Sequence, residues 1–276
     1  LWIADKIKGF FVGLILGAPI LTLIIWFSEE FKSTWWLWGF AAVAVFQVVM
    51  IVIYPRFIVP VFNKLSDLPE GELRTALFAM AKRAGFFAKA IQVIDGSKRS
   101  SHSNAYFTGF GKFKRIVIFD TLIEQLTVPE LEAVLAHEIG HYKKGHIIKM
   151  LLMGFVMIFL TFAVMGWLSA SEWFYVDFGF AEASGFGPVL LMFSMFSGLF
   201  TFWLTPIFNA FSRKNEYEAD RFAAEIVGDG ETLKSALRKL HKKNLGNLTP
   251  DKTYSAFYYS HPTLLEREEA IDSAKA

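Results

Sequence analysis

The stretch His137-Glu138-Ile139-Gly140-His141 decides the fold, and it lies in the second half of a predicted helix. That helix begins at Thr127, whose hydroxyl suits an N-cap, and Pro129 suits its first turn. Glu130 and Glu132 follow, and negative charge is favourable near a helix N-terminus because of the helix dipole. We therefore expect the whole stretch to be helical, with its two histidines on a rigid element.

The two histidines are four residues apart, which places them on the same face of a helix. Their side chains leave about 40° apart in direction and roughly 6 Å apart along the axis, so both imidazoles can bind one ion. Glu138 points about 100° away from His137, within reach of a water on that ion. This H-E-x-x-H spacing predicts two zinc ligands and a general base. Short motifs also arise by chance on surface helices, so the prediction needs further residues.

Composition indicates a membrane protein. Hydrophobic residues make up 54% of the chain and aromatic residues 17%, with 30 Phe and 8 Trp, which is unusual for a soluble enzyme. The net charge of +2 gives no general attraction to nucleic acid, and we expect no such partner. The chain has no Cys, which excludes disulfides and thiolate ligands and leaves histidine and carboxylate to bind zinc.

Four stretches are long and apolar enough to span a bilayer, residues 10–27, 35–54, 150–168 and 188–211. The second opens with Trp35, Trp36 and Trp38, as expected for an aromatic belt at a membrane interface. Buried helices of a large soluble protein are the alternative. Four such stretches in 276 residues disfavour it.

The distribution of Lys and Arg predicts the orientation in the membrane. Both are frequent in residues 56–149, whereas the connection between the third and fourth stretches has Glu172, Asp177 and Glu182 but neither Lys nor Arg. By the positive-inside rule, Lys98 and Ala276 lie inside and Glu182 lies outside. We expect a multi-pass protein whose active site faces the cytoplasm, in the endoplasmic reticulum if eukaryotic or the cytoplasmic membrane if bacterial.

The section between the second and third stretches has a mixed pattern. Residues 70–84 have the apolar spacing of an amphipathic helix, and residues 91–95 and 115–119 are strand-like. Asn104 leads into a short extended piece, Ala105-Tyr106-Phe107. A free strand edge there can pair with an extended peptide, which makes Asn104 a candidate for substrate binding. An Asn that merely forms a turn is the alternative.

The third metal ligand should be a carboxylate from another helix, and residues 212–225 follow the fourth apolar stretch. Glu216 and Asp220 share a face there, whereas Glu218 lies about 200° round from Glu216. We expect Glu216 to be the ligand and Asp220 to hold a ligand imidazole. Glu218 and Glu225 are expected on a solvated face. Ordinary exposed charge is the alternative for the whole stretch.

The remaining histidines have separate expectations. His146 is five residues past His141, about 140° round a continued helix, and is not expected to be a ligand. His241 lies in a basic helix and is expected to be solvated, and His102 has at most a supporting role. His261 precedes Pro262, which keeps it at a bend before the final helix. There it could be catalytic, or it could be buried and cap that helix.

Four motifs occur in order along the chain: residues 102–106, residues 137–141, Glu216 with Ala219 and Asp220, and Ser260-His261-Pro262. Together they resemble the M48 family of integral-membrane zinc peptidases, in particular the Ste24-type CAAX prenyl proteases. The resemblance extends from the first apolar stretch to Glu268. It implies one zinc ion held by His137, His141 and Glu216, with Glu138 as the base.

The resemblance also favours a catalytic role for His261, as a hydrogen-bond donor to the oxyanion, and substrate binding by Asn104. It implies cleavage near the C-terminus of prenylated CAAX proteins, in a chamber enclosed by membrane helices. Such proteins have seven spans, and we therefore expect further spans before Leu1. A quality-control membrane endopeptidase with the same site and a zinc-binding membrane protein without activity are the alternatives.

These expectations define a fold class: a mainly α, integral membrane protein with a cytoplasmic-side, zincin-like catalytic domain that carries a small β-sheet. Residues 1–60 form two transmembrane helices, and residues 61–149 form the catalytic domain with the H-E-x-x-H helix. Residues 150–211 form a transmembrane hairpin. Residues 212–276 complete the catalytic domain with the third ligand. The expected partners are the lipid bilayer and a peptide or prenylated protein substrate.

Overall fold

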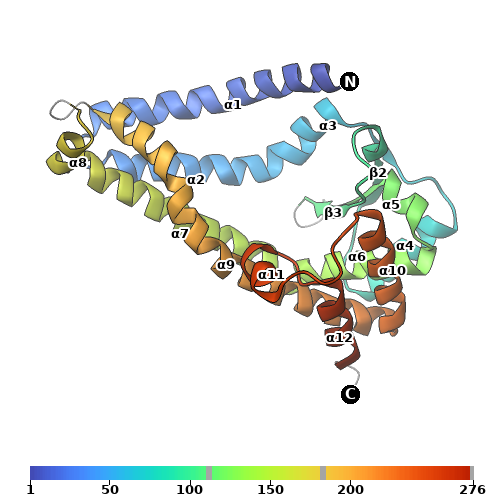
Figure 1. Cartoon of the computed structure of the whole chain (residues 1–276). Coiled ribbons are helices and arrows are strands. Elements are labelled where there is room, and N and C mark those ends of the chain that lie inside the picture. The colour runs from blue at the N-terminus through green and yellow to red at the C-terminus, as the bar shows by residue number, and fades with distance from the viewer. Residues whose placement is uncertain (110–113, 181–184, 274–276) are drawn as a thin grey trace. The chain divides into compact units, whose positions relative to one another are not determined.

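The computed structural model of the chain describes residues 1–109, 114–180 and 185–273. Within these ranges the chain is mainly helical and contains a four-stranded sheet (Figure 1). Its contacts divide it into two compact units. Unit 1 comprises Leu1–Phe62 and Ile148–Trp203, and unit 2 comprises Asn63–Ile147 and Leu204–Ala276. The expected division into four segments stays a prediction, and Glu182 and Ala276 lie outside the described residues.

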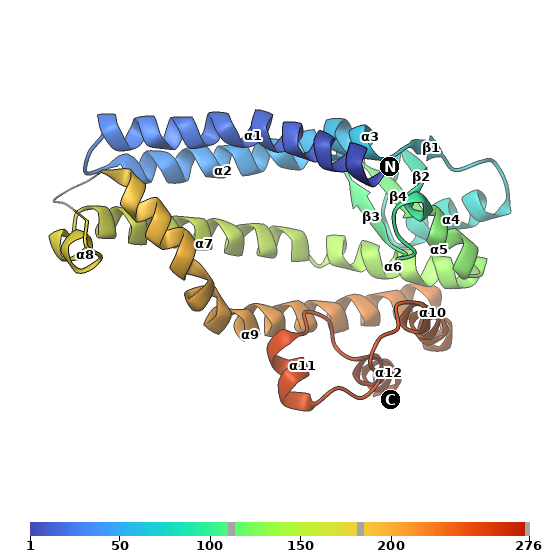
Figure 2. The same cartoon turned by 45° about the horizontal axis from the view of Figure 1, so that its top comes forward.

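Unit 1 is built from long apolar helices. Four helical stretches in the described chain are long and apolar enough to cross a membrane. They are α1 (Trp2–Glu30); α2 (Trp35–Ile53) with its continuation through η1 (Tyr54–Ile58) and α3 (Val59–Phe62); α7 (His146–Ser169); and α9 (Phe186–Val227). The short helix α8 (Glu172–Asp177) follows α7. Helices α1 and α2 run side by side (Figures 1 and 2).

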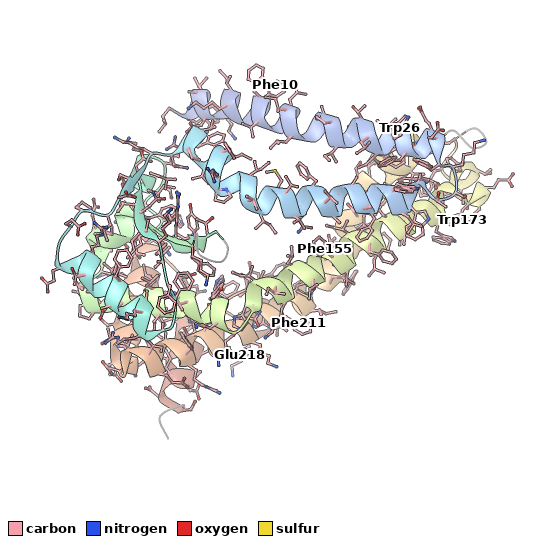
Figure 3. The ribbon with its side chains drawn as sticks, turned by 180° about the vertical axis from the view of Figure 1, so that it is seen from behind. Phe10, Trp26, Phe155, Trp173, Phe211 and Glu218 are labelled. Carbon is pink, nitrogen blue, oxygen red and sulfur yellow. The ribbon has the colours of Figure 1, made fainter. Side chains whose placement is uncertain are left out.

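Large apolar side chains cover the outer faces of these helices. Phe10 and Trp26 are exposed and project away from the ribbon of α1 (Figure 3). Contiguous apolar exposure of this kind is unfavourable in water and indicates a lipid environment. The four predicted spans are confirmed as helices. Helices α1, α7 and α9 are longer than their predicted spans, because backbone hydrogen bonds continue into polar residues that an apolarity criterion leaves out. Helix α2 ends at Ile53, one residue before the predicted end, and the chain continues as η1 and α3.

Unit 2 contains the sheet, whose strand order is β1-β2-β4-β3. Its strands are β1 (Leu65–Asp67), β2 (Ala90–Ile94), β3 (Ala105–Thr108) and β4 (Arg115–Phe119). Strands β2 and β4 are parallel, and the two outer strands pair antiparallel with them. The strands predicted at 91–95, 105–107 and 115–119 are confirmed, whereas β1 was not predicted. In the described part of the chain β3 is an edge strand.

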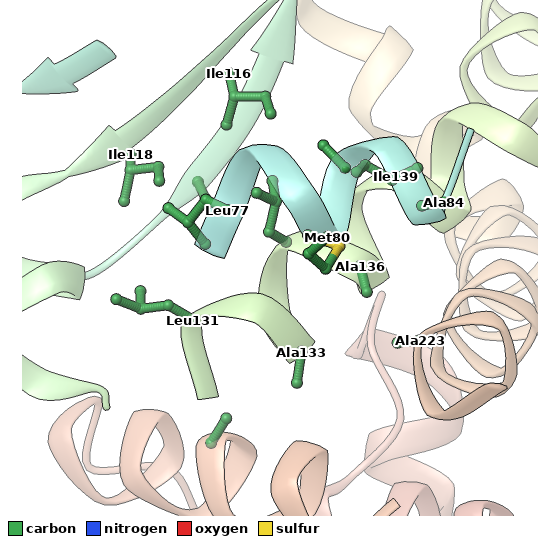
Figure 4. Close-up of a cluster of buried hydrophobic side chains, with 14 of the residues drawn as sticks. Leu77, Met80, Ala84, Ile116, Ile118, Leu131, Ala133, Ala136, Ile139 and Ala223 are labelled. Atoms are coloured by element: carbon green, nitrogen blue, oxygen red, sulfur yellow. The ribbon is translucent and has the colours of Figure 1, made fainter. Parts of the chain in front are cut away.

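Helix α6 (Val128–Lys143) has eight buried residues, more than any other described helix of unit 2. Its predicted start is confirmed, because Thr127 and Glu130 form a capping box. It packs against α4 (Glu72–Arg83), which was expected at 70–84, and against β3 and α10 (Gly230–Lys243). Figure 4 shows Leu131, Ala136 and Ile139 in this core, with Leu77 of α4 and Ile118 of β4.

The other elements of unit 2 are short. They are η2 (Gly96–Lys98), α5 (Asp120–Gln125), α11 (Lys252–Tyr258) and α12 (Leu264–Ser273). Helix α10 packs on both α6 and α12. A buried residue of α10, Leu233, and one of α12, Ile271, belong to the same apolar cluster as α6. The chain after α9 is thereby held beside the H-E-x-x-H helix.

Candidate metal centre

His137 and His141 of α6 meet Glu216 of α9 in unit 2. The two Nε2 atoms are 3.1 Å apart. One oxygen of Glu216 lies 3.5 Å from Nε2 of His137, and the other lies 3.3 Å from Nε2 of His141. One ligand atom from each residue lies within 4.8 Å of the other two. The structure therefore brings the three predicted metal ligands together.

A glycine inside the H-E-x-x-H stretch lets these helices approach closely. A Cβ atom at Gly140 would lie 3.1 Å from Cα and 3.2 Å from the carbonyl oxygen of Ala219. Both contacts are with main-chain atoms, which cannot rotate away. Ala219 is itself fully buried and lies between Glu216 and Asp220 in sequence. The small residues at 140 and 219 thus set the short distance between the imidazoles and the carboxylate.

The three side chains fit a zinc ion. Two nitrogen ligands of a tetrahedral zinc, each 2.0–2.1 Å from the metal, are roughly 3.3 Å apart, close to the observed separation of the Nε2 atoms. Oε2 of Glu216 is buried and has no hydrogen-bond partner among the described residues, as expected of a ligand atom. Nitrogen and carboxylate oxygen are donors that zinc prefers. The grouping could hold one metal ion.

Asp220 and Arg267 stand behind His137. Oδ1 of Asp220 lies 2.8 Å from Nδ1 of His137, so this carboxylate can accept the imidazole hydrogen. Arg267 of α12 donates two hydrogen bonds to Asp220, of 2.7 and 2.5 Å, and so fixes the carboxylate in turn. Burial alone lowers the pKa of His137, but the hydrogen bond to Asp220 and the nearby carboxylate of Glu216 raise it to about 9. Binding a cation here must therefore displace a proton.

Arg267 was missed at the sequence level. It lies 47 residues from its partner Asp220. A local pattern cannot show such a pairing. The available signal was an arginine in the first turn or two of the helix after Ser260-His261-Pro262. Arg267 is nearly buried, and a buried arginine needs a carboxylate partner.

Glu138 lies between the two histidines in α6 and is half-buried. Burial raises the pKa of its carboxyl above the ordinary value, although His137 and His141 act in the opposite direction. A raised pKa brings a carboxylate closer to the operating pH of a general base. This environment differs from that of Glu216, which lies against both imidazoles and Arg267.

His261 lies at the open side of the centre, in the bend between α11 and α12. Its Nε2 is 3.5 Å from Glu216, and its side chain is 63% exposed. The alternative of a buried histidine that caps the final helix is therefore wrong. Asn104 is also exposed, and it directly precedes the edge strand β3, which packs on α6. Its carbonyl accepts a hydrogen bond from the backbone N–H of Phe119, which anchors the start of β3.

The structure corrects the continuous helix assumed for His146 and the solvated face expected for Glu218. The expectation that His146 is not a metal ligand stays a prediction. Helix α6 does not continue to His146, because Gly145 adopts a left-handed φ of +68° and ends the turn. His146 instead begins α7, and its Nδ1 lies 3.0 Å from Nδ1 of His141. Glu218 does not lie on a purely solvated face, since its Oε2 is 3.1 Å from Nε2 of His146. Glu225 is exposed, as expected.

The other two histidines lie away from the three ligands. His102 is exposed, and its Nδ1 lies 2.8 Å from the hydroxyl of Ser100. His241 was expected to be solvated, but it is half-buried and its ring packs against Gly246. A Cβ atom at residue 246 would lie 2.3 Å from that ring, so a glycine is needed there for the contact.

The geometry of the site agrees with comparisons to known proteins. A model of peptidase family M48 matches residues 67–275. The chain belongs to peptidase family M48. A second model, described as the CAAX prenyl protease N-terminal region with five membrane helices, matches residues 1–64. The family assignment made from the four motifs is confirmed. M48 peptidases are zinc-dependent in general, which agrees with the His-His-Glu grouping.

The similarity to individual M48 proteins covers nearly the whole chain. CAAX prenyl protease 1 of Saccharomyces cerevisiae is 39% identical over 99% of this chain and 63% of the relative. The Homo sapiens CAAX prenyl protease 1 homolog is 34% identical over 98% of this chain and 65% of the relative. The crystal structure of S. mikatae Ste24p aligns with a TM-score of 0.89 at 40% identity, over 98% of this chain and 66% of that chain. The chain thus spans just under two thirds of the length of these relatives.

Proposed function

We propose that the whole protein is a Ste24-type membrane zinc endopeptidase that cleaves peptide bonds near the C-terminus of prenylated CAAX proteins. The observation that carries the proposal is the convergence of His137, His141 and Glu216 around one point, with Glu138 beside them. Relatives named CAAX prenyl protease 1 support the substrate class.

One zinc ion per chain would be held by His137, His141 and Glu216, and Asp220 would hold the ring of His137. When bound, the ion lowers the pKa of a water molecule to about 7 and polarises the scissile carbonyl. The chain's own residues supply the remaining chemistry. Arg267 neutralises Asp220, so the carboxylate keeps its orientation toward His137 without an unpaired buried charge.

Glu138 is the general base. It takes a proton from the attacking water and then delivers that proton to the departing amine. The half-buried position that raises the pKa of its carboxyl suits both transfers. His261 donates a hydrogen bond to the oxyanion that forms at the carbonyl carbon. Its exposed ring beside Glu216 supports this role, because a substrate can reach it.

The substrate would bind as an extended strand along β3. The outer edge of β3 offers backbone N–H and C=O groups for pairing, and β3 packs directly on α6. Asn104 has both donors and an acceptor at the start of this edge, where its side chain is exposed. We propose that it fixes the register of the substrate.

The membrane setting completes the proposal. The bilayer surrounds the apolar helices, and the active site faces the cytoplasm because lysines and arginines are concentrated between the second and third spans. The membrane would be that of the endoplasmic reticulum in a eukaryote or the cytoplasmic membrane in a bacterium.

Replacement of the base tests the reaction. In the full-length protein, Glu138→Gln should abolish hydrolysis and leave one zinc per chain, because it removes a proton acceptor and no ligand. Glu225→Gln, an exposed change on α9, is the matched control and should leave both unchanged. Zinc content and the masses of the cleavage products are measured together. Full activity in Glu138→Gln would refute the mechanism, and a wild-type protein that binds zinc but cleaves nothing would favour a non-enzymatic role.

The substrate class needs a separate comparison. Detergent-purified protein is given either a farnesylated CAAX peptide or an unmodified unfolded protein. Preferential cleavage of the farnesylated peptide supports the proposal. Cleavage of the unfolded protein alone would instead indicate a quality-control endopeptidase with the same metal centre.

A further inference from the structure

His146 is a buried histidine that the mechanism above does not use. Its side chain is only 1% exposed, although it stands at the first position of α7, directly after the break at Gly145. Its ring lies at a steep angle to that of His141, with centroids 5.1 Å apart. A buried polar ring in this place needs hydrogen-bond partners, and both of its nitrogen atoms have one.

The positions of the nitrogen atoms determine how the hydrogens are shared. Nε2 of His141 faces His137 and Glu216, so its lone pair is the one available to a metal ion. A neutral imidazole then carries its hydrogen on Nδ1. That hydrogen can be donated to Nδ1 of His146, 3.0 Å away. His146 consequently carries its own hydrogen on Nε2 and donates it to Oε2 of Glu218, 3.1 Å away.

This arrangement parallels the other side of the centre. Nδ1 of His137 is held directly by the carboxylate of Asp220. For His141 the carboxylate is one ring further away, and His146 bridges the gap. A histidine that binds a metal generally donates its second N–H to a carboxylate or another acceptor, which fixes its tautomer and its orientation.

We propose that His146 and Glu218 are positioning residues for His141, acting as a two-step relay from a carboxylate to the imidazole that binds the metal. The proposal rests on the zinc site of the proposed function. It assigns no contact with substrate to either residue. The relay holds the ring of His141 in one tautomer and one orientation, and its loss should weaken metal binding before it affects the fold.

Zinc affinity of the full-length, detergent-purified protein tests the relay, measured by competition with a chelator of known affinity. His146→Phe keeps a ring but removes both hydrogen bonds, and Glu218→Ala removes the terminal acceptor. Each should weaken zinc binding about 10–100-fold, the usual range for such partners. His146→Asn places an acceptor oxygen near the position of Nδ1 and should recover most of the loss. Glu218→Gln keeps an acceptor oxygen for His146, so its zinc affinity should be closer to that of the wild type than the affinity of Glu218→Ala.

A further measurement and a control variant separate positioning from packing. The visible spectrum of the Co²⁺-loaded protein should change in His146→Phe and resemble the wild type in His146→Asn, because it reports ligand orientation. Glu225→Gln, on the same helix as Glu218, should alter neither affinity nor spectrum. If both His146→Phe and Glu218→Ala bind zinc within about twofold of the wild type, the relay is refuted.

The zinc measurement still decides if His146→Phe does not fold or if the protein is not a peptidase. Should His146→Phe fail to fold, Glu218→Ala decides alone, since its side chain is 34% exposed and its removal leaves little unfilled space. The result is also separate from the peptidase proposal. Weakened zinc binding in a protein that cleaves no peptide would support the relay and refute the proposed function. Unchanged zinc binding in both variants of an active peptidase would refute the relay and support the proposed function.

Discussion

Glu216 faces both histidines of the centre, with one oxygen within 3.5 Å of each. We expect Glu216→Ala to lose its zinc, because two imidazoles alone leave a tetrahedral ion without a third protein ligand. Asp220→Ala should still bind zinc, but about 10–100-fold more weakly, since it removes a partner of His137 and no ligand. The zinc content and zinc affinity of the purified full-length variants check both expectations. Normal zinc in Glu216→Ala together with none in Glu218→Ala would contradict the assignment.

His261 gives a kinetic prediction. A donor to the oxyanion acts mainly in the transition state, so His261→Ala should lower kcat much more than it changes KM. The expected loss is on the order of 10²–10³ in kcat, or about 3–4 kcal/mol. Because the side chain is exposed, the variant should keep its fold and its zinc. A folded, zinc-loaded variant with unchanged kcat would leave His261 with a structural role alone.

Residue positions were predictable where a regular helix extends between them. The 3.6-residue period placed Glu216 and Asp220 on one face, and both contact the histidines in the structure. The direction predicted for the His146 side chain was wrong, because Gly145 ends α6 and His146 begins a new helix with a different axis. Lys143 and Lys144 before that glycine are a recognisable helix stop. Arg267 was out of reach of any such argument, since tertiary packing alone brings α12 to Asp220.

The N-terminus of helix α6 is held by Glu130. Its buried carboxylate accepts hydrogen bonds from Thr127, from Ser235 and from Lys239, the last two on α10. Burial alone raises the pKa of Glu130, but these bonds lower it to about 2. One carboxylate thus caps the metal-bearing helix and ties it to its neighbour.

The low pKa of Glu130 makes its contribution dependent on pH. The stabilisation is fully present above the ordinary pKa of 4.5 and is lost as the pH falls through the folded value of about 2. Glu130→Gln should therefore lower the free energy of unfolding at pH 7 by on the order of 2–3 kcal/mol. The difference from the wild type should shrink below pH 4. Thermal unfolding in detergent at pH 7 and below pH 4 measures this difference in stability. Glu124→Gln, a change at an exposed residue, is the control. An equal deficit at both pH values would show that charge is not the cause.

Elements were predictable where the side-chain pattern was strong. Long uncharged runs located all four spans, and short stretches rich in Ile and Val located β2 and β4. The three residues of β1 are too few to show an alternating pattern, and they form a strand because β2 offers them an edge. The fourth apolar span and the charged helix at residues 212–225 were predicted separately, and their continuity as one helix, α9, was missed. Its apolar part stops near residue 211, but the helix continues through the charged residues that carry Glu216.

The orientation in the membrane is testable by labelling introduced cysteines, because residues 1–276 contain none. Asp177 of α8 is exposed and lies in the connection without Lys or Arg, and Lys98 is exposed in unit 2. In intact bacteria that carry the protein in their cytoplasmic membrane, a membrane-impermeant thiol reagent should label Asp177→Cys directly. It should label Lys98→Cys only after lysis. Labelling in the opposite pattern would reverse the orientation and place the metal centre outside the cytoplasm.

The histidines of the centre differ in the access they give to reagents from solution. The exposed fractions of their side chains are 63% for His261, 20% for His141, 10% for His137 and 1% for His146. An acylating agent such as diethylpyrocarbonate attacks whichever imidazole nitrogen it can reach, so among these four the first adduct forms on His261. A bound ion would shield His137 and His141 further and leave His261 reactive. Brief acylation therefore silences the proposed oxyanion donor while the metal stays in place, a separation of roles that needs no mutation.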